Sequence, residues 1–141
     1  MYEKYTRQAL PPRDYRLLLG TALCVFNSNN AFIIENVLRN DNTIDWHELI
    51  DKTSGALKAD IEKTLPFKDD QIGELFSEIV RMRDRIVHSF QITSRNGEQS
   101  LATKTKNKDG NVQFEITGDY LMSFIKKNEK LSTLLYKHRG Y

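Results

Sequence analysis

The residues best suited to chemistry lie in one short stretch of the sequence, Arg83-Asp84-Arg85-Ile86-Val87-His88. Asp84 and His88 are four positions apart, so on a helix they lie on one strip of its surface. There a carboxylate can hold one ring nitrogen of the imidazole and leave the other free to exchange a proton near neutral pH. Arg83 falls among apolar positions, and a desolvated guanidinium is costly unless an anion meets it. We therefore expect Arg83 to have an anionic partner.

A helix over residues 71–90 must position these side chains. Its apolar residues recur with the spacing of one buried helical face, at Ile72, Leu75, Phe76, Ile79, Val80, Ile86, Val87 and Phe90. Five residues of ideal helix rotate by about 500°, which leaves Arg83 and His88 about 140° apart. The two side chains can act on one bond only if the helix frays before His88 or if a second chain joins the site.

This stretch resembles the R-x4-6-H motif of the HEPN superfamily, in which a polar residue usually follows the arginine. Arg83 to His88 gives R-x4-H with Asp84 in the polar position. Arg81 to His88 also fits, as R-x6-H, but Met82 follows Arg81, so we prefer Arg83. The resemblance covers this helix closely and the other helices only in outline. It implies an all-helical core, a homodimer in which two motif helices meet across the dimer axis, and cleavage of RNA without a metal or other cofactor.

The residue types suit such a reaction. His88 can move the proton of a ribose 2′-hydroxyl, and Arg83 can bind the charged phosphorane oxygens in bidentate fashion. Asp84 either orients His88 or pairs with Arg81 or Arg85. The expected products are a 2′,3′-cyclic phosphate and a 5′-hydroxyl. Small stand-alone chains of this superfamily resemble toxins or defence effectors, which implies an antitoxin or other neutralising protein as a partner.

Two alternatives compete with a nuclease. In the first, Arg83 pairs with Glu78, Glu48 or Asp60 in a buried helix contact, and His88 is an ordinary histidine near a helix end. In the second, the chain is a non-catalytic dimeric module of HEPN type that binds nucleotide, RNA or a protein partner, as other members of that superfamily do.

Further side chains are candidates for RNA binding. Arg81 and Arg85 flank the motif, and the other candidates are Asn29, Asn30, Lys104 and Lys106. The amides lie in a run of poor helix formers at residues 27–30, which predicts either a break in the first helix or groups that face a cleft. The lysines lie beside a turn, where they serve either as a solvated strand edge or as contacts to an RNA backbone.

Composition limits the other possibilities. The chain of 141 residues has a net charge of +2 and a single cysteine, so it is expected to form one domain without internal disulfides. We find no clustered ligand set for a metal. The N-terminal residues lack the apolar core of a signal peptide, and we find no run long enough to span a bilayer. A cytoplasmic protein without membrane contact is the expectation.

The periodicity predicts an all-α fold, an antiparallel bundle of four main helices. The helices are expected over residues 13–38, 44–65, 71–90 and 117–138. Residues 1–11 are expected to form a flexible arm, since Pro11 and Pro12 prevent it from joining the first helix. Residues 92–116, with the turn signals Asn96-Gly97 and Asp109-Gly110, predict a β-hairpin or ordered loop inserted before the last helix. The whole of 1–141 is then one domain.

Overall fold

The computed structural model describes residues 2–64 and 71–140. Its long helices are α1 (Arg13–Asn40), α4 (Gln71–Val87) and α5 (Gly118–His138), and its shorter helices are α2 (Trp46–Asp51) and α3 (Ser54–Thr64). The strands are β1 (Phe90–Thr93), β2 (Gln99–Lys104) and β3 (Gln113–Ile116). Single 3-10 turns occupy Glu3–Tyr5 and Asn107–Asp109.

The fold is mixed α/β, and the predicted all-α bundle is wrong. The strands form one antiparallel sheet in the order β1-β2-β3, in which Phe90 pairs with Ala102 and Thr103 pairs with Phe114. The sequence indicated the β2–β3 pair as a hairpin, but β1 was assigned in part to the preceding helix. Four residues that begin directly after a helix are too few to show a strand period of their own.

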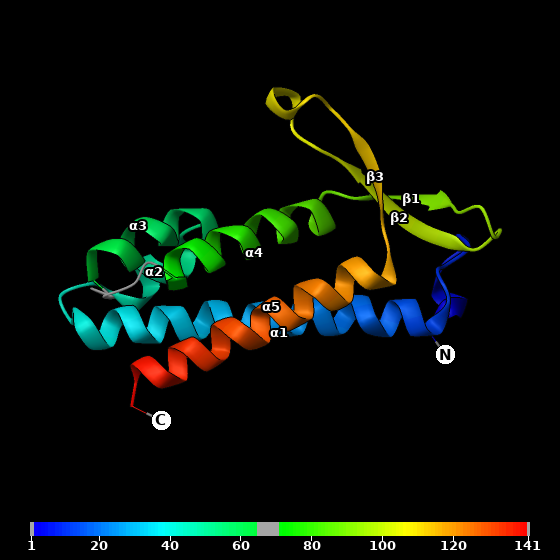
Figure 1. Ribbon diagram of the computed structural model, residues 1–141. Helices are drawn as coiled ribbons and strands as arrows, with labels where there is room; N and C mark the ends of the chain where they lie inside the picture. Colours follow the sequence, from blue (N-terminus) through cyan, green and yellow to red (C-terminus); the bar gives the residue numbers. More distant parts are fainter. Residues whose placement is uncertain (1, 65–70, 141) are drawn as a thin grey trace.

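The helices form two layers beside the sheet. Figure 1 shows α1 and α5 running along each other, with α2, α3 and α4 covering them on one side. The sheet lies at the end where α4 finishes and α5 begins, and the tip of the β2–β3 hairpin projects away from the helices (Figure 1). The phenolic oxygen of Tyr15 donates to the carbonyl oxygen of Ile116 at 2.5 Å, which ties the sheet to α1.

The core lies between the two helical layers. The ring of Phe26 in α1 is stacked on Phe76 of α4 with centroids 6.5 Å apart, and it lies 6.1 Å from the ring of Phe124 in α5. One aromatic side chain from each long helix thus meets at the centre of the molecule, where ring pairs add to the stability gained by burial.

Two of the expected helices differ internally from the prediction, and α4 ends at Val87 rather than at residue 90. The expected helix over 44–65 is divided into α2 and α3. The side-chain oxygen of Thr53 accepts a hydrogen bond from the backbone amide of Ala56 at 3.3 Å, and this cap begins a new helix. The expected interruption at residues 27–30 is absent from α1, which runs without a break. There the buried amide of Asn29 finds a partner on α5, and this contact outweighs its weak helix propensity.

Helix α1 corrects a further expectation. By length and composition it could cross a membrane, although we expected no such run. A single helix of this kind near an N-terminus is weak evidence, because core helices of proteins outside membranes pass the same test. One face of α1, with Phe26, Ile33 and Ile34, is buried against the other helices.

Candidate functional site

The motif residues lie at the C-terminal end of α4. The amide nitrogen of His88 donates to the carbonyl oxygen of Asp84 at 2.9 Å, so the helical hydrogen-bond pattern extends to His88. The hydroxyl of Ser89 then donates to the carbonyl oxygen of Ile86 at 2.6 Å, and the chain turns into β1 at Phe90. Because the helix does not fray before His88, Arg83 and His88 project about 140° apart around it. Within one chain the structure does not bring these two side chains together.

Arg83 lies half-buried between α1, α3 and α4. Its guanidinium carbon is 5.2 Å from the ring centroid of Phe26, and its Nη2 donates to the hydroxyl of Ser54 at 3.4 Å. Among the described residues, its nearest carboxylate is that of Asp84, with Nη1 and Oδ1 3.6 Å apart, a distance longer than a good hydrogen bond. The Nε atom is buried and has no hydrogen-bond partner among the described residues. The guanidinium therefore retains unused donor capacity.

The alternative in which Arg83 pairs with Glu78, Glu48 or Asp60 is not realised within residues 2–64 and 71–140. Glu78 pairs instead with Lys127 at 2.8 Å, and Asp60 pairs with Lys52 at 2.9 Å. No ion pair joins Arg83 to Glu48 in the same part of the chain. Within the described residues, Arg83 thus has no strong anionic partner, although its position in the apolar stripe led us to expect one.

The two predicted amides have different surroundings. Asn30 accepts the hydroxyl of Ser54 at 2.8 Å, which places it one hydrogen bond away from Arg83. Asn29 is only 5% exposed, and its amide nitrogen donates to the backbone carbonyl oxygen of Asn128 at 2.8 Å and to its side-chain oxygen at 3.0 Å. Asn30 belongs to the neighbourhood of Arg83, whereas the amide of Asn29 is committed to the contact between α1 and α5.

His88 is exposed to solvent at the end of α4. Its ring makes no hydrogen bond to any residue that the structure describes, and the carboxylate of Asp84 lies instead near Arg83. The neighbouring side chains Val87 and Phe90 are 50% and 45% exposed. This end of α4 thus exposes an imidazole and two large apolar side chains that are close to it in sequence.

A basic cleft lies at the same helical end, on the side of α4 that carries Asp84 rather than the side that carries Arg83. It has a volume of about 410 Å³ and separates α4 from the β2–β3 hairpin, with the lining residues Arg81, Asp84, Arg85, Thr105, Lys106, Lys108, Asp109 and Phe114. A guanidinium nitrogen of Arg85 donates to the backbone carbonyl oxygen of Lys104 and so fixes the hairpin to the helix. The structure thus brings together Arg81, Arg85 and Lys106, which the sequence nominated separately.

The lining of this cleft differs from the prediction at two residues, Lys104 and Phe114. The ammonium of Lys104 does not line it, because it donates to the side-chain oxygen of Asn111 within the hairpin at 2.7 Å. Phe114 was not nominated from the sequence, although its alternation with Gln113 and Glu115 placed it on the half-buried face of the strand. Its ring lies 5.7 Å from that of Tyr120, and burial raises the pKa of the Tyr120 phenol despite the opposing charge of Arg85.

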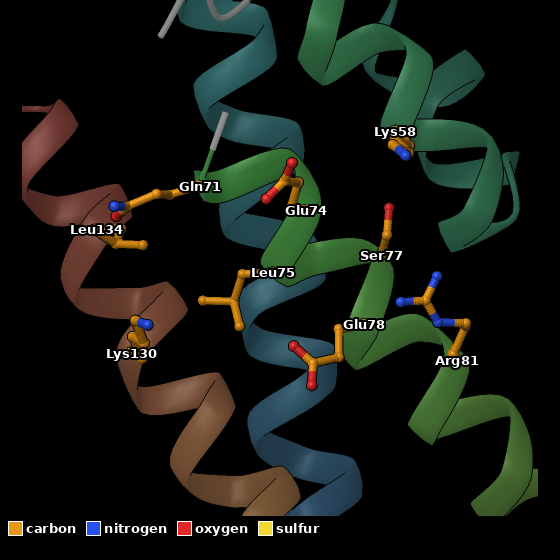
Figure 2. Close-up of a pocket in the computed structure, with 9 residues that line it drawn as sticks. All are labelled: Lys58, Gln71, Glu74, Leu75, Ser77, Glu78, Arg81, Lys130 and Leu134. Carbon is orange, nitrogen blue, oxygen red and sulfur yellow. The ribbon is translucent and has the colours of Figure 1, made fainter. Parts of the chain in front are cut away.

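A second cleft lies on the other side of Arg81, between α3, α4 and α5. Its volume is about 490 Å³, and its charged lining residues are of both signs, Lys58, Glu74, Glu78, Arg81 and Lys130. Figure 2 shows the Ser77 hydroxyl and the Arg81 guanidinium on the side of α4 toward Lys58. The Ser77 hydroxyl is buried without a hydrogen-bond partner among the described residues. Its three cations and two carboxylates give a net charge of only +1 with both signs mixed, so this cleft attracts anions less strongly than the basic cleft.

Over the described ranges, no three side chains of His, Cys, Asp or Glu cluster where they could hold a metal ion. Comparisons of the chain with protein-family models, with curated proteins and with solved structures find no match. The resemblance to the HEPN superfamily therefore rests on the residues of α4 and on His88 directly after it.

Proposed function

We propose that the protein is a dimeric endoribonuclease of HEPN type that cleaves RNA without a metal. One observation carries the proposal. An exposed imidazole and an incompletely paired guanidinium lie at one helical end, about 140° apart on a helix that stays intact between them. One chain cannot direct both side chains at one phosphate, but two copies related by a twofold axis can supply Arg83 from one and His88 from the other.

The surroundings of both residues support a composite site. The Arg83 side chain is still partly exposed, and its only carboxylate contact among the described residues is Asp84 at 3.6 Å, so the exposed part of the guanidinium retains donor capacity for a phosphate oxygen. Val87 and Phe90 are half-exposed apolar side chains beside His88, and a second copy would remove them from water. A twofold interface at this end of α4 would therefore join the two halves of the site and cover this surface together.

The chemistry would follow from these two groups. His88 takes the proton of the 2′-hydroxyl as its oxygen attacks the adjacent phosphorus, and Arg83 binds the oxygens that become more negative. The bond from phosphorus to the 5′-oxygen breaks, and the leaving oxygen takes a proton from water or from His88 of the second copy. Asp84, which lies nearer to Arg83 than to the imidazole, would hold the guanidinium in place.

The test is cleavage of total cellular RNA in the presence of EDTA, followed by analysis of the new ends. We expect wild-type protein to produce 2′,3′-cyclic phosphate and 5′-hydroxyl ends, and His88→Ala and Arg83→Ala to produce none while the dimer persists in light scattering. His47→Ala is the matched control, because it removes another exposed imidazole. Equal cleavage by His88→Ala, or a monodisperse monomer, would refute the proposal.

The cellular role we propose is that of a cytoplasmic toxin or defence effector, kept inactive by an antitoxin or other neutralising protein. Expression of the wild-type chain should then arrest growth, and expression of His88→Ala should not. If cells that express wild type grow as fast as cells that express the same amount of His88→Ala, the protein is not a toxic nuclease.

A second candidate is a non-catalytic dimeric module that binds nucleotide, RNA or a protein partner. The contacts of Arg83 with Phe26 and Ser54 favour it, because they give the guanidinium a structural role within one chain. This candidate predicts that RNA binds with the same affinity to wild type and His88→Ala and that neither protein cuts it.

A further inference from the structure

The cleft between α4 and the β2–β3 hairpin concentrates positive charge in a chain that is nearly neutral. Four cations, Arg81, Arg85, Lys106 and Lys108, line it with only two carboxylates, those of Asp84 and Asp109. The cleft alone thus carries a net charge of +2, equal to that of all 141 residues. Cations gathered on low-dielectric walls focus their field and attract anions.

The walls of this cleft are held in place by the fold. Arg85 bonds to the backbone of β2 at Lys104, so the hairpin is attached to the helix beside the opening. At the tip, the amide of Asp109 donates to the carbonyl oxygen of Lys106 at 2.8 Å, and the amide of Val112 donates to the hydroxyl of Thr105 at 2.8 Å. Gly110, with a φ of 92°, completes the turn in a conformation that favours glycine. Lys106 and Lys108 therefore project from an ordered turn.

One wall of the cleft is aromatic. Phe114 lines it from β3, and Tyr120 of α5 packs against the Phe114 ring with the two centroids 5.7 Å apart. Phe114 is half-buried, so Tyr120 supports it while part of it still borders the opening. Cationic groups beside an accessible aromatic side chain are the combination that binds the phosphates and the unpaired bases of a single strand.

The size of the cleft separates a single strand from a duplex. Its volume of about 410 Å³ lies within the range of roughly 300–1,000 Å³ that is usual for small-ligand sites. In a duplex the bases are stacked and paired, so they cannot turn onto an aromatic side chain in such a recess. A single strand can place one base there and leave its flanking phosphates at the cationic rim.

We propose that this cleft binds single-stranded RNA, with one unpaired base against Phe114 and the adjacent phosphates on Arg81, Arg85, Lys106 and Lys108. The choice of RNA over DNA rests on the proposed ribonuclease function, whereas the preference for a single strand rests on the cleft itself. The cleft would hold the strand beside the site of cleavage and so restrict the substrate to unpaired regions. None of Lys106, Lys108 and Phe114 is part of the proposed catalytic set.

The test measures binding separately from cleavage. A fluorescent single-stranded oligonucleotide of 2′-O-methyl RNA, which lacks the attacking hydroxyl, is titrated with wild-type protein and followed by anisotropy at several salt concentrations. We expect Lys106→Ala/Lys108→Ala to weaken binding about 10-fold and to reduce the salt slope by about 1.4, since each phosphate contact on a single strand contributes about 0.7. Phe114→Leu, which keeps an apolar side chain, should weaken binding about 5-fold or more without changing the slope.

The matched control is Lys63→Ala/Lys137→Ala, which removes the same charge from two exposed lysines in the last turns of α3 and α5. Its affinity should stay within about 2-fold of wild type, because the lost charges lie outside the cleft. Thermal unfolding of every variant shows whether Phe114→Leu still folds. If it does not, the variant Lys106→Ala/Lys108→Ala provides the test. Single-stranded DNA and an RNA duplex are the competing ligands.

Two results would overturn the inference. One is an affinity of the cleft variants equal to that of the control, and the other is a duplex that binds as tightly as the single strand. Tight cleft-dependent binding of the single strand by a protein that cuts no RNA would support the inference and refute the proposed catalysis. Cleft variants that bind RNA and cleave it as wild type does would refute the inference and support the proposed catalysis.

Discussion

The guanidinium of Arg83 lies over the ring of Phe26, with 5.2 Å between its central carbon and the ring centroid. This contact directs a side chain of the motif helix toward the core, while the exposed His88 projects elsewhere from the same helical end. A single chain therefore presents the two halves of the motif to different surroundings. Under the proposed function, each site would therefore take Arg83 from one chain and His88 from another.

Mixing two inactive variants tests this arrangement directly. In a dimer of Arg83→Ala with His88→Ala, one of the two composite sites keeps both wild-type side chains. After random exchange of subunits we expect about a quarter of wild-type RNA cleavage to return, since about half of the dimers are mixed and each has one intact site. Cleavage is measured before and after mixing. A mixture as inactive as its components would mean that Arg83 and His88 act from the same chain or not at all.

Arg83→Met separates a catalytic guanidinium from a structural one. Methionine keeps most of the apolar contact with Phe26 and removes a charge that has no strong partner among the described residues. We expect the free energy of unfolding, measured in urea, to change by no more than about 1 kcal/mol, because replacing a poorly paired buried charge is often neutral. RNA cleavage should fall by about 100-fold or more. A loss of stability above about 3 kcal/mol would assign the guanidinium to the fold.

Asn29→Ala should destabilise the protein by about 1–3 kcal/mol, because it leaves the buried side-chain oxygen of Asn128 without its donor. Asn27→Ala is the matched control on the exposed side of the same helix, and it should change stability by less than about 0.5 kcal/mol. Both values come from urea unfolding. Equal stability of the two variants would show that the contact between α1 and α5 does not depend on this amide.

His138 predicts a dependence of stability on pH. Partial burial, and then the charge of Arg39, lower the pKa of the His138 imidazole below its ordinary value of 6.5. Below about pH 6.5 the unfolded chain therefore binds more protons than the folded chain at this residue, so its contribution to stability is present above that pH and is lost as the pH falls through the folded pKa. Wild type should lose more stability than His138→Gln between pH 7.5 and pH 5.0 in urea titrations. The same loss in both proteins would contradict the shift.

Periodicity predicted the parts of the fold in which one local signal dominates. The start of α1, the apolar face of α4 and the extent of α5 match the expected helices, and the alternation around Phe114 predicted strand β3. The division of α2 from α3 depends on a single capping hydroxyl, that of Thr53, and strand β1 is defined by its pairing with β2. Such features are settled by contacts that a local pattern does not contain.

The candidate site also depends on contacts that a local sequence pattern does not contain. The position of Arg83 in an apolar stripe predicted its partial burial, but its contacts with Ser54 and Phe26 come from helices far away in sequence. Asn29 and Asn30 are adjacent and of one type, yet only their places around α1 decide that one is committed to Asn128 and the other lies near Arg83. The meeting of Arg85 with the hairpin likewise depends on how the sheet is placed against α4.

The hydrogen bond from Arg85 to the backbone of β2 joins helix α4 to the sheet. Arg81, Arg83 and Arg85 are two residues apart along α4. A small rotation of this helix about its axis would therefore move Arg83, which lies over Phe26, together with Arg81 and Arg85, which line the cleft. A strand lodged beneath the hairpin would resist that rotation. Under the proposed function, binding of the strand in the cleft and the position of Arg83 at the site of cleavage would then depend on the same rotation of α4.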